Sequence, residues 1–82
     1  MPTILRVRGL RITIHFNDHW PPHVHVIGPD GQARVALGDA CDKPSLMSND
    51  GLSGSDVAIA QAEIERNCQL LRLRWSEIHG DC

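Results

Sequence analysis

The sequence predicts an α+β fold: a small, mostly antiparallel sheet of three or four strands, with one long C-terminal amphipathic helix packed on one face. In the first half of the chain, apolar and polar residues alternate with the period of a strand. Glycine and proline separate these stretches. In the second half, apolar residues recur at the spacing of one helical face. The 82 residues are expected to form a single domain, 1–82, around one modest core.

Four strands are predicted in the first half of the chain, at about residues 4–7, 11–16, 23–27 and 32–37. The second has the clearest pattern, because Ile12, Ile14 and Phe16 fall on one face and polar residues fall between them. A turn at Gly28–Gly31 joins the third strand to the fourth, since proline presets φ and glycine permits positive φ.

Residues 38–52 are predicted to be a surface loop, with at most a helical turn at 45–47, and a helix is predicted over about residues 55–79. Ser53 stands three residues before Asp56, as in a capping box. The apolar stripe consists of Ala60, Ile64, Cys68, Leu71, Trp75 and Ile78, widened by Leu70 and Leu73. A straight helix of about 24 residues would be about 36 Å long. Its end would overhang so small a body, which favours a homodimer or a partner surface there.

Net charge, apolar runs and cysteine spacing indicate which partners and which cellular compartment the protein is expected to have. The net charge of -2 argues against general attraction to nucleic acid. No apolar run has the length of a signal peptide or of a membrane span. The cysteines, Cys41, Cys68 and Cys82, are few and irregularly spaced, so they are expected to be reduced thiols in a cytoplasmic protein with no membrane partner.

Four of the five histidines fall within eleven residues, from position 15 to position 25. If the second and third predicted strands pair with their isoleucines and valines on one side, the paired residue numbers must have an even sum. His15 then lies opposite His23 or His25. All three imidazoles are therefore expected to project from one face of the sheet, near Thr13 and Arg34.

Three stretches resemble one known family. They read Met-Pro-Thr-Ile-Leu-Arg at 1–6, Asn-Asp-His-Trp-Pro-Pro-His-Val-His-Val at 17–26, and Trp-Ser-Glu-Ile-His-Gly at 75–80. They resemble the bacterial family known as domain of unknown function 4160, over essentially the whole chain. The resemblance implies a small single-domain bacterial protein, often encoded beside another small protein, as in a toxin–antitoxin pair. It implies no catalytic residues.

The histidines support a metal-site hypothesis. His23 and His25 lie two residues apart on a strand, roughly 6.5 Å along it, and His15 would complete a three-histidine site for zinc or nickel. Asp18 or His19 would then serve as an outer partner or general base. The alternatives are adventitious binding of these ions, and histidines that occupy a wet face beside a structural double proline.

Two functions follow from these observations, and whether the protein is an enzyme stays open. In the first, it is a binding or regulatory component of a two-protein, toxin–antitoxin-like module. A sheet face of histidine and arginine then contacts a small partner protein encoded nearby, or nucleic acid. His19, Trp20 and Arg34 are the predicted partner contacts.

In the second, it is a metal-dependent or histidine-based hydrolase, for example a ribonuclease. His15 or His23 would be the acid or base, Asp18 a further catalytic candidate, and Arg34 the phosphate clamp. The enzyme requires imidazoles that converge beside a cleft, whereas the binding protein requires a flat or shallow face with divergent rings.

Overall fold

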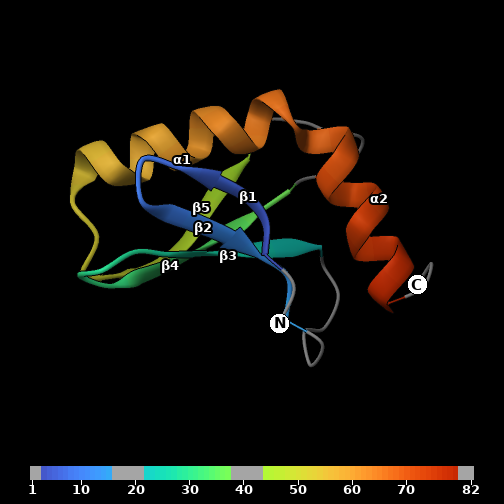
Figure 1. Ribbon diagram of the computed structural model, residues 1–82, viewed down its shortest axis with the longest axis horizontal. Coiled ribbons are helices and arrows are strands. Elements are labelled where there is room, and N and C mark those ends of the chain that lie inside the picture. The colour runs from blue at the N-terminus through green and yellow to red at the C-terminus, as the bar shows by residue number, and fades with distance from the viewer. Residues whose placement is uncertain (1–2, 16–21, 38–43, 80–82) are drawn as a thin grey trace.

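The computed structural model of the protein describes residues 3–15, 22–37 and 44–79. In these ranges the elements are β1 (Thr3–Val7), β2 (Leu10–Thr13), β3 (His23–Ile27), β4 (Gln32–Ala36), β5 (Ser45–Asp50), α1 (Gly54–Arg66) and α2 (Cys68–His79). The strands form one antiparallel sheet in the order β1-β2-β3-β4-β5. Helix α1 runs along the sheet, and α2 turns away from its line (Figure 1). The α+β class and the antiparallel sheet are thus confirmed.

The core lies between the helices and one face of the sheet, which we call the helix face. Alternate residues of the three middle strands reach it, so the period of two seen in the sequence has a direct structural counterpart. The helices close the core with side chains three and four residues apart. Its most buried members are Leu10, Ile12, Ile14, Val24, Val26, Val35, Leu37, Ile64, Leu71 and Trp75.

The β2–β3 register sends the polar residues to the opposite face. Ile12 pairs with Val26, and Thr13 pairs with His25. Both pairs have an even sum, as the parity argument predicted, so the apolar residues share the helix face. The other face carries Arg6, Arg11, Thr13, His25, Arg34 and Ser48, and we call it the histidine face.

The prediction of three or four strands was wrong, because β5 lies within the stretch predicted as the loop 38–52. The strand reads Ser-Leu-Met-Ser-Asn-Asp, a sequence without apolar alternation and with few residues of high β-propensity. Most of its residues are exposed. Pairing with β4 stabilises it instead. At its end, the Asn49 side chain donates to the Leu52 carbonyl and accepts from the Leu52 amide, at 2.9 and 3.0 Å.

The prediction of one long helix over 55–79 was also wrong, because the helix breaks at Asn67. The Asn67 backbone amide donates to the carbonyls of Glu63 and Ile64, and its side-chain amide donates to the Glu63 carbonyl at 2.9 Å. The Asn67 carbonyl then accepts the Leu71 amide within α2. Asparagine is unfavourable inside a helix because its side chain forms hydrogen bonds with nearby backbone groups.

The break alters how the apolar stripe is buried. A straight helix of about 36 Å would exceed the longest dimension of the molecule, 33 Å, whereas the bent pair fits along it. Cys68, Leu71 and Trp75 of α2 still reach the core. Leu70 and Leu73 do not widen the stripe, because both are exposed. The overhang that favoured a dimer is therefore absent from the described helices.

The local signals at element ends were more accurate. The Ser53 hydroxyl accepts a hydrogen bond from the Asp56 amide at 3.1 Å and caps α1, as the capping pattern predicted. The predicted turn at Gly28–Gly31 is closed by the Gly28 amide, which donates to the Gly31 carbonyl at 2.9 Å. Strand β2 ends at Thr13 rather than at position 16, which is outside the described residues.

Cys68 corrects the expectation of three reduced thiols. It is buried at the start of α2 and is disulfide-bonded. Its Sγ atom lies 4.0 Å from the Leu37 carbonyl oxygen, which places the start of α2 beside the end of β4. Within the described residues, neither helix has the length and apolar character needed to cross a membrane.

Candidate functional site

Cross-strand pairing assembles the site on the histidine face. Thr13, His25, Arg34 and Ser48 are consecutive neighbours across β2, β3, β4 and β5. Antiparallel neighbours in one such row lie on the same side of the sheet with Cβ atoms about 5 Å apart. Four strands thus bring together side chains that span 35 residues of sequence.

The three histidines named by the sequence lie together. The rings of His15 and His25 are stacked, with centroids 3.6 Å apart and an interplanar angle of 4°. His23 is tilted by 56° against His25, with centroids 5.3 Å apart. His23 and His25 are only 7% and 9% exposed. The alternative in which these histidines merely occupy a wet face is therefore wrong for β3, whose residues are buried on both sides.

A pocket of about 430 Å³ opens beside the stacked rings. Arg34 is exposed at its rim, and its Nε donates to the Ser48 hydroxyl at 3.1 Å. One carboxylate, that of Asp50, also lines it. The residues around the pocket are His15, His25, Gln32, Ala33, Arg34, Ser48 and Asp50.

The stacked geometry does not suit a three-histidine metal site. The lone pair of an imidazole nitrogen lies in the ring plane, and zinc binds about 2.0–2.1 Å from that nitrogen. The His15 and His25 planes are nearly parallel and 3.6 Å apart at their centroids, so one ion cannot lie in both. In the described parts of the chain, no three His, Cys, Asp or Glu side chains are arranged to hold a metal.

Of the seven predicted site residues, four lie together and three lie outside the described residues. His15, His25 and Arg34 line one pocket, and His23 adjoins it through its contact with His25. Asp18, His19 and Trp20 lie outside the described residues. The fifth histidine, His79, is elsewhere, because its ring lies 4.3 Å from that of Trp75 on α2.

Sequence reasoning missed Gln32, Ser48 and Asp50 as pocket residues. Ser48 and Asp50 belong to β5, which the sequence did not reveal. Gln32 lies on a predicted strand with the same parity as Arg34, so the alternation of β4 already placed it on the histidine face. That parity was the signal available for it.

The fold and the pocket define the protein as a small α+β domain with a histidine–arginine surface on its sheet. The family described as Domain of unknown function (DUF4160) matches residues 9–76, well over half of the chain, so the chain belongs to this family. No curated protein and no solved structure matches it. The resemblance to this family is thus confirmed over residues 9–76, which include the motif at 17–26 but not the one at 1–6.

Proposed function

We propose that the protein is a binding or regulatory component of a two-protein, toxin–antitoxin-like module, and that its histidine face contacts the partner. The observation that carries this proposal is the His15–His25 stack beside exposed Arg34 in an open pocket. The stacked rings form part of the pocket wall, and the exposed guanidinium of Arg34 adds a directional, charged contact there. The proposed partner is a small protein encoded nearby, with an acidic surface complementary to Arg34.

The arrangement of the rings favours binding over catalysis. A general base needs a ring nitrogen directed at the proton it abstracts, and a metal-bound water needs ligands that converge on one ion. The stacked and tilted rings of His15, His23 and His25 do not converge in this way. The hydrolase alternative, with His15 or His23 as acid or base and Arg34 as clamp, is therefore the second candidate.

The test is co-purification of the full chain with the product of the adjacent gene, followed by titration calorimetry of the complex. We expect His25→Gln and Arg34→Gln each to weaken the complex by about tenfold or more, since a hydrogen bond to a charged group of the acidic partner contributes about 1.5–3 kcal/mol. Arg66→Gln is the matched control, because it removes the same charge from a helix surface where Arg66 pairs with Glu63 at 3.4 Å. Absence of a complex, or equal weakening by the control, would contradict the proposal.

A turnover assay completes the test. The same preparations are assayed for RNA hydrolysis. Turnover that is lost in a folded His23→Gln variant would establish the hydrolase instead.

A further inference from the structure

A second cationic site lies at the β1–β2 hairpin. Arg6 and Arg11 are directly opposite each other in the antiparallel register, on the histidine face, and both are exposed. Like charges at directly opposed positions destabilise a strand pair. Neither arginine has an ion-pair or hydrogen-bond partner among the described residues. The fold therefore carries an unfavourable charge pair that nothing in the described chain neutralises.

The turn of this hairpin adds a third arginine in an unfavourable conformation. Arg8 has φ of 49° and Gly9 has φ of 80°, and positive φ at both central residues is typical of a two-residue type I′ turn. Such turns favour asparagine, aspartate or glycine at the first position, whereas arginine adopts positive φ at a cost in energy. Neither the opposed pair nor the turn residue is explained by the stability of the hairpin.

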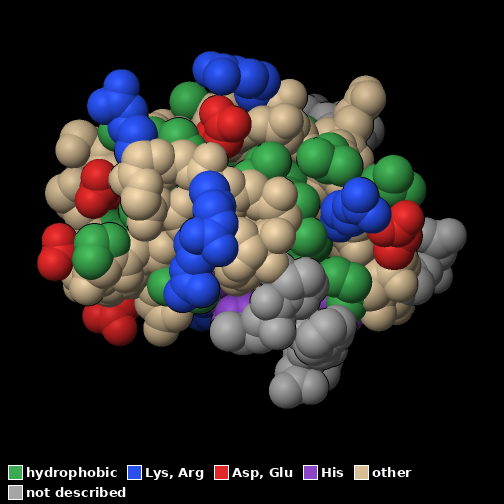
Figure 2. Space-filling view, in the orientation of Figure 1, with side chains coloured by type: hydrophobic (Ala, Val, Ile, Leu, Met, Phe, Trp, Pro, Cys, Tyr) green, Lys and Arg blue, Asp and Glu red, His purple; other side chains and the backbone are tan. Residues whose placement is uncertain are grey.

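The arginines border a pocket of about 620 Å³. That volume is within the usual range for small-ligand sites, about 300–1,000 Å³. The wall consists of Arg6, Val7, Arg8, Gly9, Leu10, Arg11, Ile27, Gly28 and Pro29, with no carboxylate among them. Figure 2 shows arginine side chains over the β1–β2 region.

We propose that this pocket binds a phosphate group through Arg6 and Arg11. Each planar guanidinium matches two phosphate oxygens in a bidentate contact. The terminal phosphate of a small molecule carries about two negative charges and offsets both arginines, whereas one carboxylate offsets only one. Two successive backbone phosphates of a polynucleotide, with one charge each, do the same. The apolar residues Ile27 and Pro29 at the pocket wall supply a surface for the rest of the ligand.

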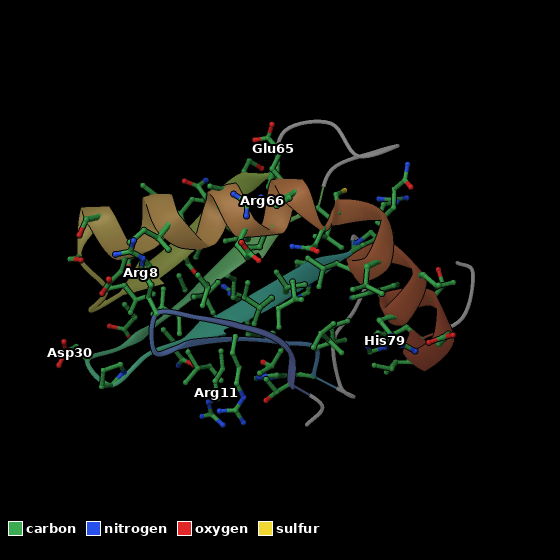
Figure 3. All side chains as sticks on the ribbon, turned by 45° about the horizontal axis from the view of Figure 1, so that its top comes forward. Arg8, Arg11, Asp30, Glu65, Arg66 and His79 are labelled. Carbon is green, nitrogen blue, oxygen red and sulfur yellow. The ribbon has the colours of Figure 1, made fainter. Side chains whose placement is uncertain are left out.

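This site lies on the same face of the sheet as the partner contact proposed above, but it uses other residues, because neither the histidines nor Arg34 line its pocket. Arg11 extends from the sheet on the side away from the helices, while Arg66 lies on the helical layer (Figure 3). The phosphate has two sources that share this chemistry: a small phosphorylated molecule, or the backbone of a polynucleotide. The experiment distinguishes them.

The full chain is titrated by calorimetry with inorganic phosphate, with pyrophosphate and with a short single-stranded oligoribonucleotide. We expect at least one probe to bind, and Arg11→Gln and Arg6→Gln each to weaken it by about tenfold or more. Arg66→Gln, which makes the same charge change at a distance, should leave binding unchanged. Tighter binding of pyrophosphate identifies a small ligand. Tighter binding of the oligoribonucleotide, with a steep loss at high salt, identifies a polynucleotide.

The urea midpoint of the same variants distinguishes phosphate binding from a structural role of the two arginines. If Arg6 and Arg11 served the fold, their replacement would lower the urea midpoint, whereas removal of a like-charge pair should leave it unchanged or raise it. Using both single variants keeps the test valid if one fails to fold. The proposal is overturned if no probe binds, if Arg66→Gln weakens binding as much, or if both variants lower the midpoint and retain wild-type affinity.

Discussion

The two faces of one sheet differ in composition although the same strands build both. On the helix face, Ile12 and Val26 are fully buried under α1 and α2. On the histidine face, the neighbouring pair Thr13 and His25 is also nearly buried, yet it leads outward to exposed Arg34. One face therefore consists of side chains whose burial stabilises the fold, and the other concentrates polar groups that folding alone does not require.

Because the two faces differ, neighbouring residues of one strand can affect different properties, either the stability of the fold or the binding of a partner. A strand places consecutive side chains on opposite faces, so two adjacent positions can serve different purposes without conflict. Substitutions on the helix face should change the free energy of unfolding, whereas substitutions at exposed positions of the histidine face should change affinity. The expected changes in stability below run from the largest to the smallest, and the last of them is compared with a large change at the adjacent core residue.

The largest effect is expected at Ile64, which is fully buried where α1 meets the sheet. Ile64→Ala removes buried methyl groups and leaves a cavity, so the free energy of unfolding should fall by about 2–5 kcal/mol. Leu73→Ala is the matched control, because Leu73 is 56% exposed and should change stability by no more than about 0.5 kcal/mol. Urea denaturation measures both, and equal losses would contradict the assignment of the helix face.

A second loss of stability is expected at Gly31, where the β3–β4 turn meets the end of β5. A Cβ atom at this position would overlap the Asp50 carbonyl oxygen and the Gly51 backbone. Gly31→Ala should therefore lower the free energy of unfolding by about 1–3 kcal/mol, as overpacking does. At Gly54 a Cβ atom would meet nothing within 4 Å, so Gly54→Ala should not lower stability. A tolerant Gly31 would mean that β5 is not packed as described.

The sequence predicted the helix face more fully than the elements at its margins. Alternation revealed β2, β3 and β4, because each middle strand must place apolar residues on the core side. Strand β5 was missed because an edge strand of serine, asparagine and aspartate carries no such pattern. The break at Asn67 was missed because Ile64, Cys68 and Leu71 keep helical spacing across it.

The site was predicted only as far as strand parity extends. Parity placed His15, His23 and His25 on one face, because a one-residue slip would expose the core residues. It could not predict ring orientation, since side-chain torsions are set by packing with neighbours. The metal hypothesis assumed convergent rings, and the His15–His25 stack removes that assumption.

A smaller change, this time a gain, is expected at the hairpin turn. Arg8 holds positive φ without the asparagine or glycine that a type I′ turn favours. Arg8→Asn should raise the free energy of unfolding by about 0.5 kcal/mol or more, because asparagine enters this region at lower cost. Thermal unfolding at low ionic strength measures the gain. A loss of stability would mean that the Arg8 side chain has a structural role in the hairpin.

The smallest change in stability is expected at Arg34, and the comparison with Val35 tests the two faces directly. These residues are adjacent in β4, but Val35 is 1% exposed and Arg34 is exposed. Val35→Ala should lower the free energy of unfolding by about 1.5–3 kcal/mol, because it removes two buried methyl groups, at about 0.8 kcal/mol each, and leaves a cavity. Arg34→Ala breaks only an exposed hydrogen bond to Ser48, so its effect should stay within about 0.5 kcal/mol. If Arg34→Ala destabilised the chain as much as Val35→Ala, Arg34 would stabilise the sheet. The assignment of the histidine face as a contact surface would then be contradicted.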